Sequence, residues 1–329
     1  MHDIAIINGT IVDGSGSAPY LGYILISDGV IVSTGVDPSF HNDDMRASIT
    51  IDAKNKIVCP GFIDIHTHSD LTLIADGRGE SKLRQGVTTE VVGNCSFSAF
   101  PIEPLNLDLH ADHLARATAP LRPWWTDFDG YAKALEDQGI AINVASLTGH
   151  GTLRVAAMGV DQRQATKYEL DRMVNDLHTA ISQGAFGMST GLTHVPSAYG
   201  DFDEIETLAE VLAEHHALYA THCRDSKPDE RAAIAESIEI GRRTGVSVEF
   251  SHLAINRPER WGTGSELLAM FDEAREDGVD IYFDVYPYEA SSSSLTQYLP
   301  PWVQAGGTAE MRSRLANPEL RETALSDMS

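Results

Sequence analysis

The sequence is poor in cysteine, in basic residues and in long apolar runs, and each shortage excludes a class of protein. Three cysteines in 329 residues cannot build the disulfide framework of a small secreted domain, which favours a reducing, cytoplasmic location. Lys and Arg number 24 against 48 Asp and Glu, a formal net charge of −24. Nucleic acid and anionic membrane surfaces are therefore not expected partners. No apolar run approaches the roughly 20 residues of a membrane helix, and the N-terminus lacks the pattern of a signal peptide.

Residues 1–59 predict a small β domain. Strand-forming residues alternate there with turn signals, of which Asn8-Gly9 indicates one hairpin and Ser27-Asp28-Gly29 another. We expect an antiparallel unit, the N-terminal part of a composite β-sandwich.

From Pro60 onward, strands alternate with amphipathic helices, which predicts parallel strands joined by crossover helices. The expected fold class is α/β, a (β/α)8 TIM-barrel type over residues 60–329 beside the small β-sandwich domain. Only about seven strands are present, because nothing after Tyr288 has the pattern of an eighth, so we expect a barrel that is incomplete at its C-terminus. The expected strands cover 62–66, 88–92, 142–147, 186–189, 218–222, 247–252 and 280–286, and the clearest helices 169–183, 205–215 and 229–243.

The stretch PGFIDIHTHSD, at the first of these strands, carries the most informative pair of residues, His66 and His68. Side chains two apart on a strand point to the same face. Both imidazoles therefore project to one side where the strand ends, a geometry that suits a metal ion with open coordination positions. A His-x-His pair also occurs by chance with a purely structural role.

Further candidate ligands follow other strands, as the barrel architecture requires of an active site. Cys95 follows the second strand, and His222 and His252 end the fifth and sixth. Imidazole and thiolate together form a zinc-type ligand set. Cys95 could instead be a buried small hydrophobic residue. His150, at the end of the third strand, could contact substrate or support the site, and a structural role is equally open.

These motifs carry a family resemblance. The chain resembles the amidohydrolase superfamily and, within it, the N-acyl-D-amino-acid deacylases, or D-aminoacylases. The superfamily mark is PGFIDIHTH, and the deacylase branch is indicated by the GNC and YPY segments. The other matching motifs are INGTIVDGSG, QGVTTEVVGNC, NVASLTGHGTLR, GAFGMSTGL, YATHCRDS, SVEFSHL and DVYPYEAS.

The resemblance implies roles for the matched positions. Cys95, His222 and His252 would hold a tight Zn²⁺. His66 and His68 would lie towards a second, weaker site that Cys95 could bridge. Three more residues would lie near the substrate: Tyr286, Tyr288 and Arg224. Arg224 is equally well explained as a solvated or structural arginine.

The implied reaction is hydrolysis of a linear amide bond in an N-acyl-D-amino acid, which releases a carboxylate and a free D-amino acid. The family's general-base Asp comes from the eighth strand, which would lie beyond Ser329, so the catalytic residue is not assigned within this chain. Asp70 and Asp284 are the nearest carboxylates, and neither is an expected substitute. Ser96 also stands where the family has Gly.

Two alternatives stay open. The chain could be a metal-binding but catalytically impaired remnant, or a cyclic amidase of the hydantoinase or dihydroorotase type. An incomplete barrel exposes the edge of its seventh strand, and such an edge promotes association. Besides a small-molecule substrate, the expected partner is therefore a second copy of the chain or a complementary chain.

Overall fold

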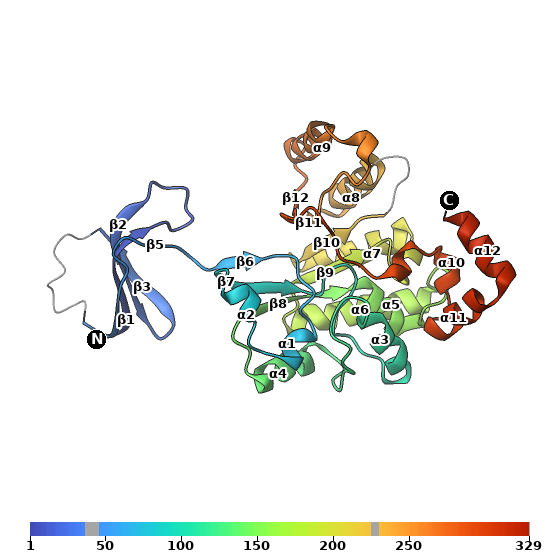
Figure 1. Cartoon of the computed structure of the whole chain (residues 1–329), viewed down its shortest axis with the longest axis horizontal. Helices are drawn as coiled ribbons and strands as arrows, with labels where there is room; N and C mark the ends of the chain where they lie inside the picture. The colour runs from blue at the N-terminus through green and yellow to red at the C-terminus, as the bar shows by residue number, and fades with distance from the viewer. Residues whose placement is uncertain (37–45, 225–229, 329) are drawn as a thin grey trace. The chain divides into compact units, whose positions relative to one another are not determined.

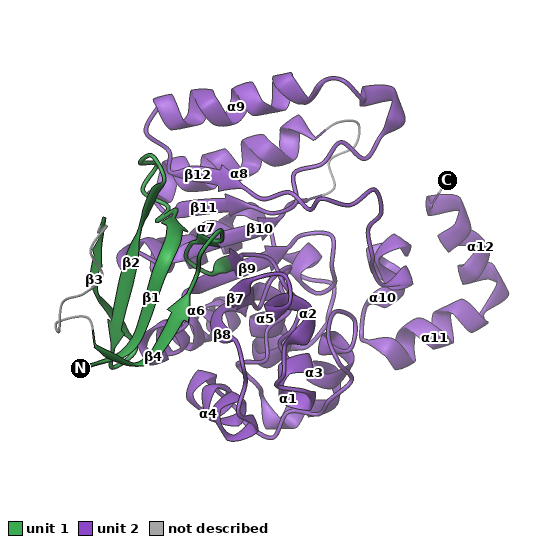
Figure 2. Ribbon diagram, turned by 60° about the vertical axis from the view of Figure 1, so that its left-hand side comes forward, with its two compact units in different colours: residues 1–62 green, residues 63–329 purple. Residues whose placement is uncertain are grey.

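The computed structural model describes residues 1–36, 46–224 and 230–328. The chain divides into two compact units, Met1–Phe62 and Ile63–Ser329, coloured separately in Figure 2. Each unit has its own sheet. No helix within the described ranges is long and apolar enough to cross a membrane, and the cytoplasmic location stays a prediction.

The first unit is a single five-stranded sheet in the order β3-β2-β1-β4, with β5 also paired to β1. The hairpin predicted at Ser27-Asp28-Gly29 is confirmed, since β2 and β3 pair antiparallel on either side of it. This sheet is the layer expected of the N-terminal part of a sandwich. The strands are β1 (His2–Ile11), β2 (Tyr20–Ser27), β3 (Val30–Gly35), β4 (Ala47–Asp52) and β5 (Ile57–Val58).

Two details predicted for this unit are wrong. Asn8-Gly9 is no hairpin, because β1 runs straight through it; Asn8 adopts a φ of 61° and the register with β2 shifts between Ile6 and Gly9. A bulge and a tight turn both favour Asn and Gly, so the dipeptide alone did not distinguish them. The unit is also not wholly antiparallel: β4 and β5 pair parallel with β1, on the side away from β2.

The second unit is built on a curled sheet of seven strands in chain order, a half-barrel (Figure 1). The registers given for neighbours from β7 to β12 are all parallel. This confirms the predicted α/β barrel-type fold, with each of the seven predicted strands present. They are β6 (Phe62–Asp64), β7 (Val87–Val92), β8 (Asn143–Gly149), β9 (Gly187–Gly191), β10 (Leu218–His222), β11 (Ser247–Phe250) and β12 (Ile281–Phe283).

Helices connect these strands, and their ends carry the expected signals. Thr166 and Glu169 form a reciprocal capping box at the start of α6, and α8 ends at Gly245, with a φ of 74°. The start predicted for α8 at Asp229 lies outside the described residues. The helices are α1 (Thr72–Ala75), α2 (Glu80–Leu83), α3 (Leu107–Leu114), α4 (Phe128–Gln138), α5 (His150–Met158), α6 (Lys167–Gln183), α7 (Phe202–Glu214), α8 (Arg231–Thr244), α9 (Gly264–Glu276), α10 (Pro301–Gln304), α11 (Thr308–Ala316) and α12 (Pro318–Asp327).

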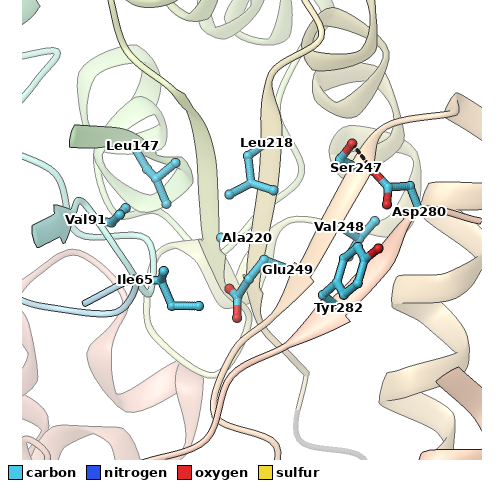
Figure 3. A pocket seen from close by; sticks show the side chains of 10 residues that line it. All are labelled: Ile65, Val91, Leu147, Leu218, Ala220, Ser247, Val248, Glu249, Asp280 and Tyr282. Atoms are coloured by element: carbon cyan, nitrogen blue, oxygen red, sulfur yellow. Dashed lines mark hydrogen bonds between the residues drawn. The ribbon is translucent and has the colours of Figure 1, made fainter. Parts of the chain in front are cut away.

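The two faces of the curled sheet differ. On one side, α7, α8 and α9 pack against β10, β11 and β12 and close the main apolar core, which includes Leu208, Ile234 and Phe271. On the other side, a mostly apolar cavity of about 290 Å³ lies between β6 and β12, with Ile65 at one wall and Tyr282 at the other (Figure 3). This inner face ends at the strand termini that carry the candidate site.

Candidate metal centre

Tight backbone geometry directly after β7 holds the candidate ligand Cys95 in place. Gly93 directly follows β7 with a φ of 80°, and a Cβ there would lie 2.1 Å from the carbonyl oxygen of Leu147. Only glycine fits such an approach. Cys95 and Ser96 then take φ values of 52° and 74°, a left-handed conformation that non-glycine residues adopt at a cost. Glycine would adopt the conformation of Ser96 without this cost.

Three ligand-type atoms converge at the carboxyl ends of β6, β7 and β11. The Nε2 atom of His66 lies 3.2 Å from Cys95 Sγ, and His252 Nε2 lies 3.7 Å from the same sulfur. All three atoms fall within 4.8 Å of one another. A single ion could contact all three after small side-chain movements, because zinc binds sulfur at about 2.3 Å and imidazole nitrogen at about 2.0–2.1 Å.

His68 and His222 flank this trio. The His68 ring lies 5.6 Å from that of His66, and the His222 ring lies 4.5 Å from that of His252. His68 Nδ1 is buried without a hydrogen-bond partner, whereas His222 Nε2 lies 2.7 Å from the Thr193 hydroxyl. The five predicted ligands therefore form one contiguous group, called the open cluster below, with the trio at its middle.

The electrostatics of the open cluster suit a cation. Burial, reinforced by the neighbouring histidines, lowers the pKa of His68 to about 3 and that of His252 to about 4, and holds the pKa of His222 well below its usual value. These rings are neutral at physiological pH, the form that binds metal. Burial also raises the pKa of the Cys95 thiol, so a bound cation would be needed to stabilise the thiolate. The residues present therefore fit a zinc ion.

Two carboxyl groups lie directly behind the trio. Asp284, at the end of β12, accepts a hydrogen bond from His66 Nδ1 at 2.9 Å and lies beside Glu249. Burial and the Asp284 charge raise the pKa of Glu249 to about 9. Burial opposes ionisation of Asp284 as well, but its hydrogen bonds from His66, Glu249 and the His252 backbone hold its pKa below the ordinary value.

Asp70 is not in this group. Its side chain is buried, near Glu90, and burial raises the pKa of Asp70 to about 7. The backbone carbonyl of Asp70 accepts a hydrogen bond from the Tyr131 hydroxyl, which braces the loop after β6. The expectation that Asp70 does not serve as the general base stays a prediction.

His150 lies in a second, fully enclosed group, called the closed cluster below. Its Nδ1 lies 2.8 Å from the Ser197 hydroxyl and its Nε2 lies 2.8 Å from a Glu204 oxygen. Arg154 donates to both oxygens of Glu204, at 2.5 and 2.7 Å. Both ring nitrogens of His150 therefore have protein partners, and the four side chains are buried. The substrate contact predicted for His150 stays a prediction.

The remaining predicted substrate residues are more exposed. Arg224 pairs with Glu236 and donates to the Gly200 carbonyl, at the wall of an open cavity of about 650 Å³. Tyr286 and Tyr288 follow β12 and are 40% and 70% exposed. Their predicted contact with substrate is likewise untested.

Residues outside the predicted set of site residues also border the open cluster. The His194 ring lies 4.6 Å from that of His222 and 5.2 Å from that of Phe97, and Phe97 stacks on the buried His113. His113 comes from α3, within the long connection between β7 and β8. His113 could have been suggested from the sequence, because this connection directly follows Cys95 and contains histidine.

The comparisons with known proteins agree with this geometry. The sequence profile of the amidohydrolase family matches residues 50–319. This chain belongs to the amidohydrolase family. N-acyl-D-glutamate deacylase of Alcaligenes xylosoxydans xylosoxydans is 38% identical over 293 residues, which cover 89% of this chain and 58% of that enzyme. D-aminoacylase of the same organism is 35% identical over 295 residues, 90% of this chain and 59% of that enzyme.

Solved structures give the same result. N-acyl-D-glutamate deacylase from Bordetella bronchiseptica, crystallised with zinc and a phosphonate mimic of the tetrahedral intermediate, matches with a TM-score of 0.80 and 38% identity. A crystal structure of D-aminoacylase matches with a TM-score of 0.77 and 33% identity. Each match covers 89% of this chain and 60% of the other. The resemblance to the deacylase branch is thus confirmed, and the chain spans about three fifths of the length of these relatives.

Proposed function

We propose that this polypeptide is the metal-binding part of a zinc-dependent hydrolase that deacylates N-acyl-D-amino acids. The observation that carries the proposal is the meeting of His66, Cys95 and His252 within 4.8 Å at the carboxyl edge of the sheet. Deacylases with zinc and with the same fold support the choice of reaction.

The proposed ligands are the five residues of the open cluster. Cys95, His222 and His252 would hold a tight ion, and His66 and His68 a weaker one, with Cys95 in reach of both. A bound zinc ion supplies Lewis acidity and lowers the pKa of a coordinated water. The chain's own contribution is to keep the rings of His68, His222 and His252 neutral by burial and to orient the ligands from several strand ends.

Substrate contacts are proposed for the groups at the rim of this edge. The hydroxyls of Tyr286 and Tyr288 and the guanidinium of Arg224 are the donors available for a substrate carboxylate or carbonyl. His150 would reach substrate only by giving up one of its two present partners, Ser197 or Glu204.

Metal content and turnover test the proposal together. The purified chain should retain close to one zinc per polypeptide after dialysis, and it should hydrolyse N-acetyl-D-glutamate, N-acetyl-D-aspartate or an apolar N-acetyl-D-amino acid in preference to the L-enantiomer. Hydantoin and dihydroorotate in the same panel test the cyclic-amidase alternative. Failure to take up zinc after reconstitution would refute the metal centre.

A second candidate, metal binding without turnover by this polypeptide alone, is favoured by one observation. The two carboxyl groups behind the trio are both engaged: Asp284 accepts from His66 and from the His252 backbone, and Glu249 is protonated at neutral pH. Neither is free to act as general base. Zinc retention with no turnover of any N-acyl-D-amino acid would support this candidate.

The open edges of the half-barrel suggest how turnover could be restored. β6 and β12 each have one sheet neighbour among the described strands, and Phe62, Ile63 and Tyr282 on them are exposed. We propose that a further strand, from a second polypeptide or a second copy of this chain, pairs there and brings a carboxylate to the metal centre. Sedimentation velocity should show concentration-dependent association, and a monomer at high concentration would contradict it.

A further inference from the structure

Asp284 joins parts of the open cluster that lie far apart in the chain. It follows β12, the last strand of the sheet, yet it bonds to His66, which follows β6, the first strand. The two residues are 218 positions apart. The curl of the sheet therefore brings its two outer strands within hydrogen-bond reach at the carboxyl edge, and Asp284 is the residue that makes the link.

Each oxygen of Asp284 has its own partner. Oδ2 lies 2.9 Å from His66 Nδ1, and Oδ1 accepts the backbone N–H of His252 at 2.6 Å. A carboxylate is an acceptor at both oxygens. His66 must therefore carry a proton on Nδ1, and the side chain of Asp284 accepts from these two donors as well as from the Glu249 carboxyl.

The first consequence concerns the tautomer of His66. A neutral imidazole carries one proton. With that proton on Nδ1, the lone pair of Nε2 points towards Cys95 Sγ, 3.2 Å away. In the metal-free protein this lone pair can accept the thiol hydrogen of Cys95. When an ion is bound, the same lone pair can bind the ion instead. A carboxylate behind a metal-binding histidine has this orienting effect.

The second consequence concerns the backbone at His252. This residue takes a φ of 44°, a conformation that is costly without glycine. Three bonds hold it there: the His252 N–H donates to Asp284 Oδ1, the Leu253 N–H donates to the Asp284 carbonyl, and the Asp284 N–H donates to the Phe250 carbonyl. Asp284 thus fixes the strained turn that aims the His252 ring at Cys95.

We propose that Asp284 is a positioning residue of the metal centre: it selects the Nδ1–H tautomer of His66 and fixes the turn that carries His252. The inference rests on the proposed metal centre for its functional meaning, but the tautomer itself can be measured without any metal. It also explains why Asp284 is not free to serve as general base.

The test is the Asp284→Asn variant, observed by ¹⁵N NMR of its histidine rings in the metal-free state. Asn offers one acceptor oxygen and one donor NH₂ group. If the oxygen keeps the His252 N–H, the NH₂ faces His66 Nδ1, and the ring proton must move to Nε2. We expect the His66 signals, assigned by their loss in a His66→Gln variant, to change from Nδ1–H to Nε2–H. An Nε2–H tautomer in the unsubstituted protein, or no change in Asp284→Asn, would overturn the proposal.

Two further variants control for structural effects. Asp280→Asn makes the same change in the residue preceding β12, where Asp280 bonds the Ser247 hydroxyl, and it should leave the His66 tautomer unchanged. Asp284→Glu keeps two acceptor oxygens and should keep the Nδ1–H tautomer. If the Asp284→Asn variant does not fold, the Asp284→Glu variant provides the test. Loss of the Nδ1–H tautomer of His66 in folded Asp284→Glu would overturn the proposal.

Zinc affinity separates this inference from the proposed function. Loss of an outer partner of a ligating histidine weakens metal binding by about 10–100-fold, so Asp284→Asn should lose that much affinity and Asp280→Asn none. If the unsubstituted protein binds no zinc but the tautomer changes as expected, the metal centre fails and the positioning role stands. If zinc binds equally well to Asp284→Asn and the tautomer does not change, the positioning role fails and the metal centre stands.

Discussion

The molecule buries histidine in two clusters that differ in one respect. In the closed cluster, both nitrogens of His150 have protein partners, Ser197 and Glu204, and Arg154 neutralises the carboxylate. In the open cluster, the nitrogens of His66 and His252 face a common sulfur, and a buried nitrogen of His68 has no partner. Both clusters lie near the carboxyl ends of strands of the same sheet.

This difference separates a structural histidine from one that can bind a metal. A buried polar atom without a partner costs about 1–3 kcal/mol, so the unpartnered Nδ1 of His68, beside the trio, favours a ligand in the open cluster. In the closed cluster, protein partners satisfy both ring nitrogens of His150 and both oxygens of Glu204, although the buried Arg154 Nε has no partner. Burial alone does not distinguish the two clusters, since His150 and His222 both have a pKa lowered chiefly by burial.

The largest expected effect is that of Cys95→Ser in the open cluster. Removal of the sulfur shared by both proposed ions should weaken zinc binding by more than the roughly 100-fold cost of losing an outer partner. Competition with a chelator measures the change. Cys59→Ser, at an exposed cysteine, is the matched control, and equal zinc affinity in the two variants would show that the clusters do not differ as described.

Glu204→Gln should give the opposite pattern in the closed cluster. It leaves the buried Arg154 guanidinium without its counter-charge, and breaking such a pair costs about 3–5 kcal/mol in free energy of unfolding. Zinc affinity should be unchanged. Glu206→Gln, on the same helix and paired with the exposed Arg243, should cost at most about 1 kcal/mol. Urea unfolding measures both, and a large loss of zinc binding in Glu204→Gln would contradict the separation.

The pH dependence of the metal-free protein should reflect the open cluster more than the closed one. The pKa of His68 is lowered to about 3 and that of His252 to about 4, from 6.5, so below pH 6.5 the unfolded chain binds protons that the folded chain does not. The contribution of these two rings to stability should therefore be constant above about pH 6.5 and fall as the pH drops towards 4.

The His68→Gln variant should show a shallower fall of unfolding free energy over this window, because one of the contributing rings is gone. Denaturant unfolding at a series of pH values gives the slope. A slope identical to that of the unsubstituted protein would mean that His68 is not held neutral by burial.

The smallest effect is expected at an exposed histidine pair, His178 and His215, whose rings are joined by a 2.9 Å contact between α6 and α7. Water can replace either partner there. His178→Gln should change the free energy of unfolding by no more than about 0.5 kcal/mol and leave zinc affinity unaltered. A measurable loss of zinc would show that histidine pairs outside the open cluster also hold metal.

The strand pattern predicted much of the site because barrel strands end at one edge. The bounds of β10 were predicted to the residue, and Cys95, His222 and His252 were placed together by the rule that parallel strands share a carboxyl edge. The rule does not describe how strongly the sheet curls. The contact between His66 and Asp284 depends on that curl, so this contact could not be predicted from the strand pattern.

Short sequence motifs gave wrong predictions where two kinds of local backbone structure favour the same residues. Asn8-Gly9 favours a hairpin turn and a bulge alike, and only the pairing of β1 with β4 and β5 decides between them. His113 and His194 were left out of the predicted site residues because neither lies at a strand end. The His113 ring contacts Phe97, and the His194 ring contacts both Phe97 and His222. Such contacts depend on the packing of loops, which no periodicity in the sequence describes.

The most direct test of the metal centre is X-ray absorption at the zinc edge of the reconstituted protein. The open cluster predicts one sulfur ligand at about 2.3 Å together with imidazole nitrogens at about 2.0–2.1 Å, and loss of the sulfur contribution in Cys95→Ser. Coordination by nitrogen and oxygen alone in the unsubstituted protein would contradict the central claim that His66, Cys95 and His252 meet in order to bind a metal.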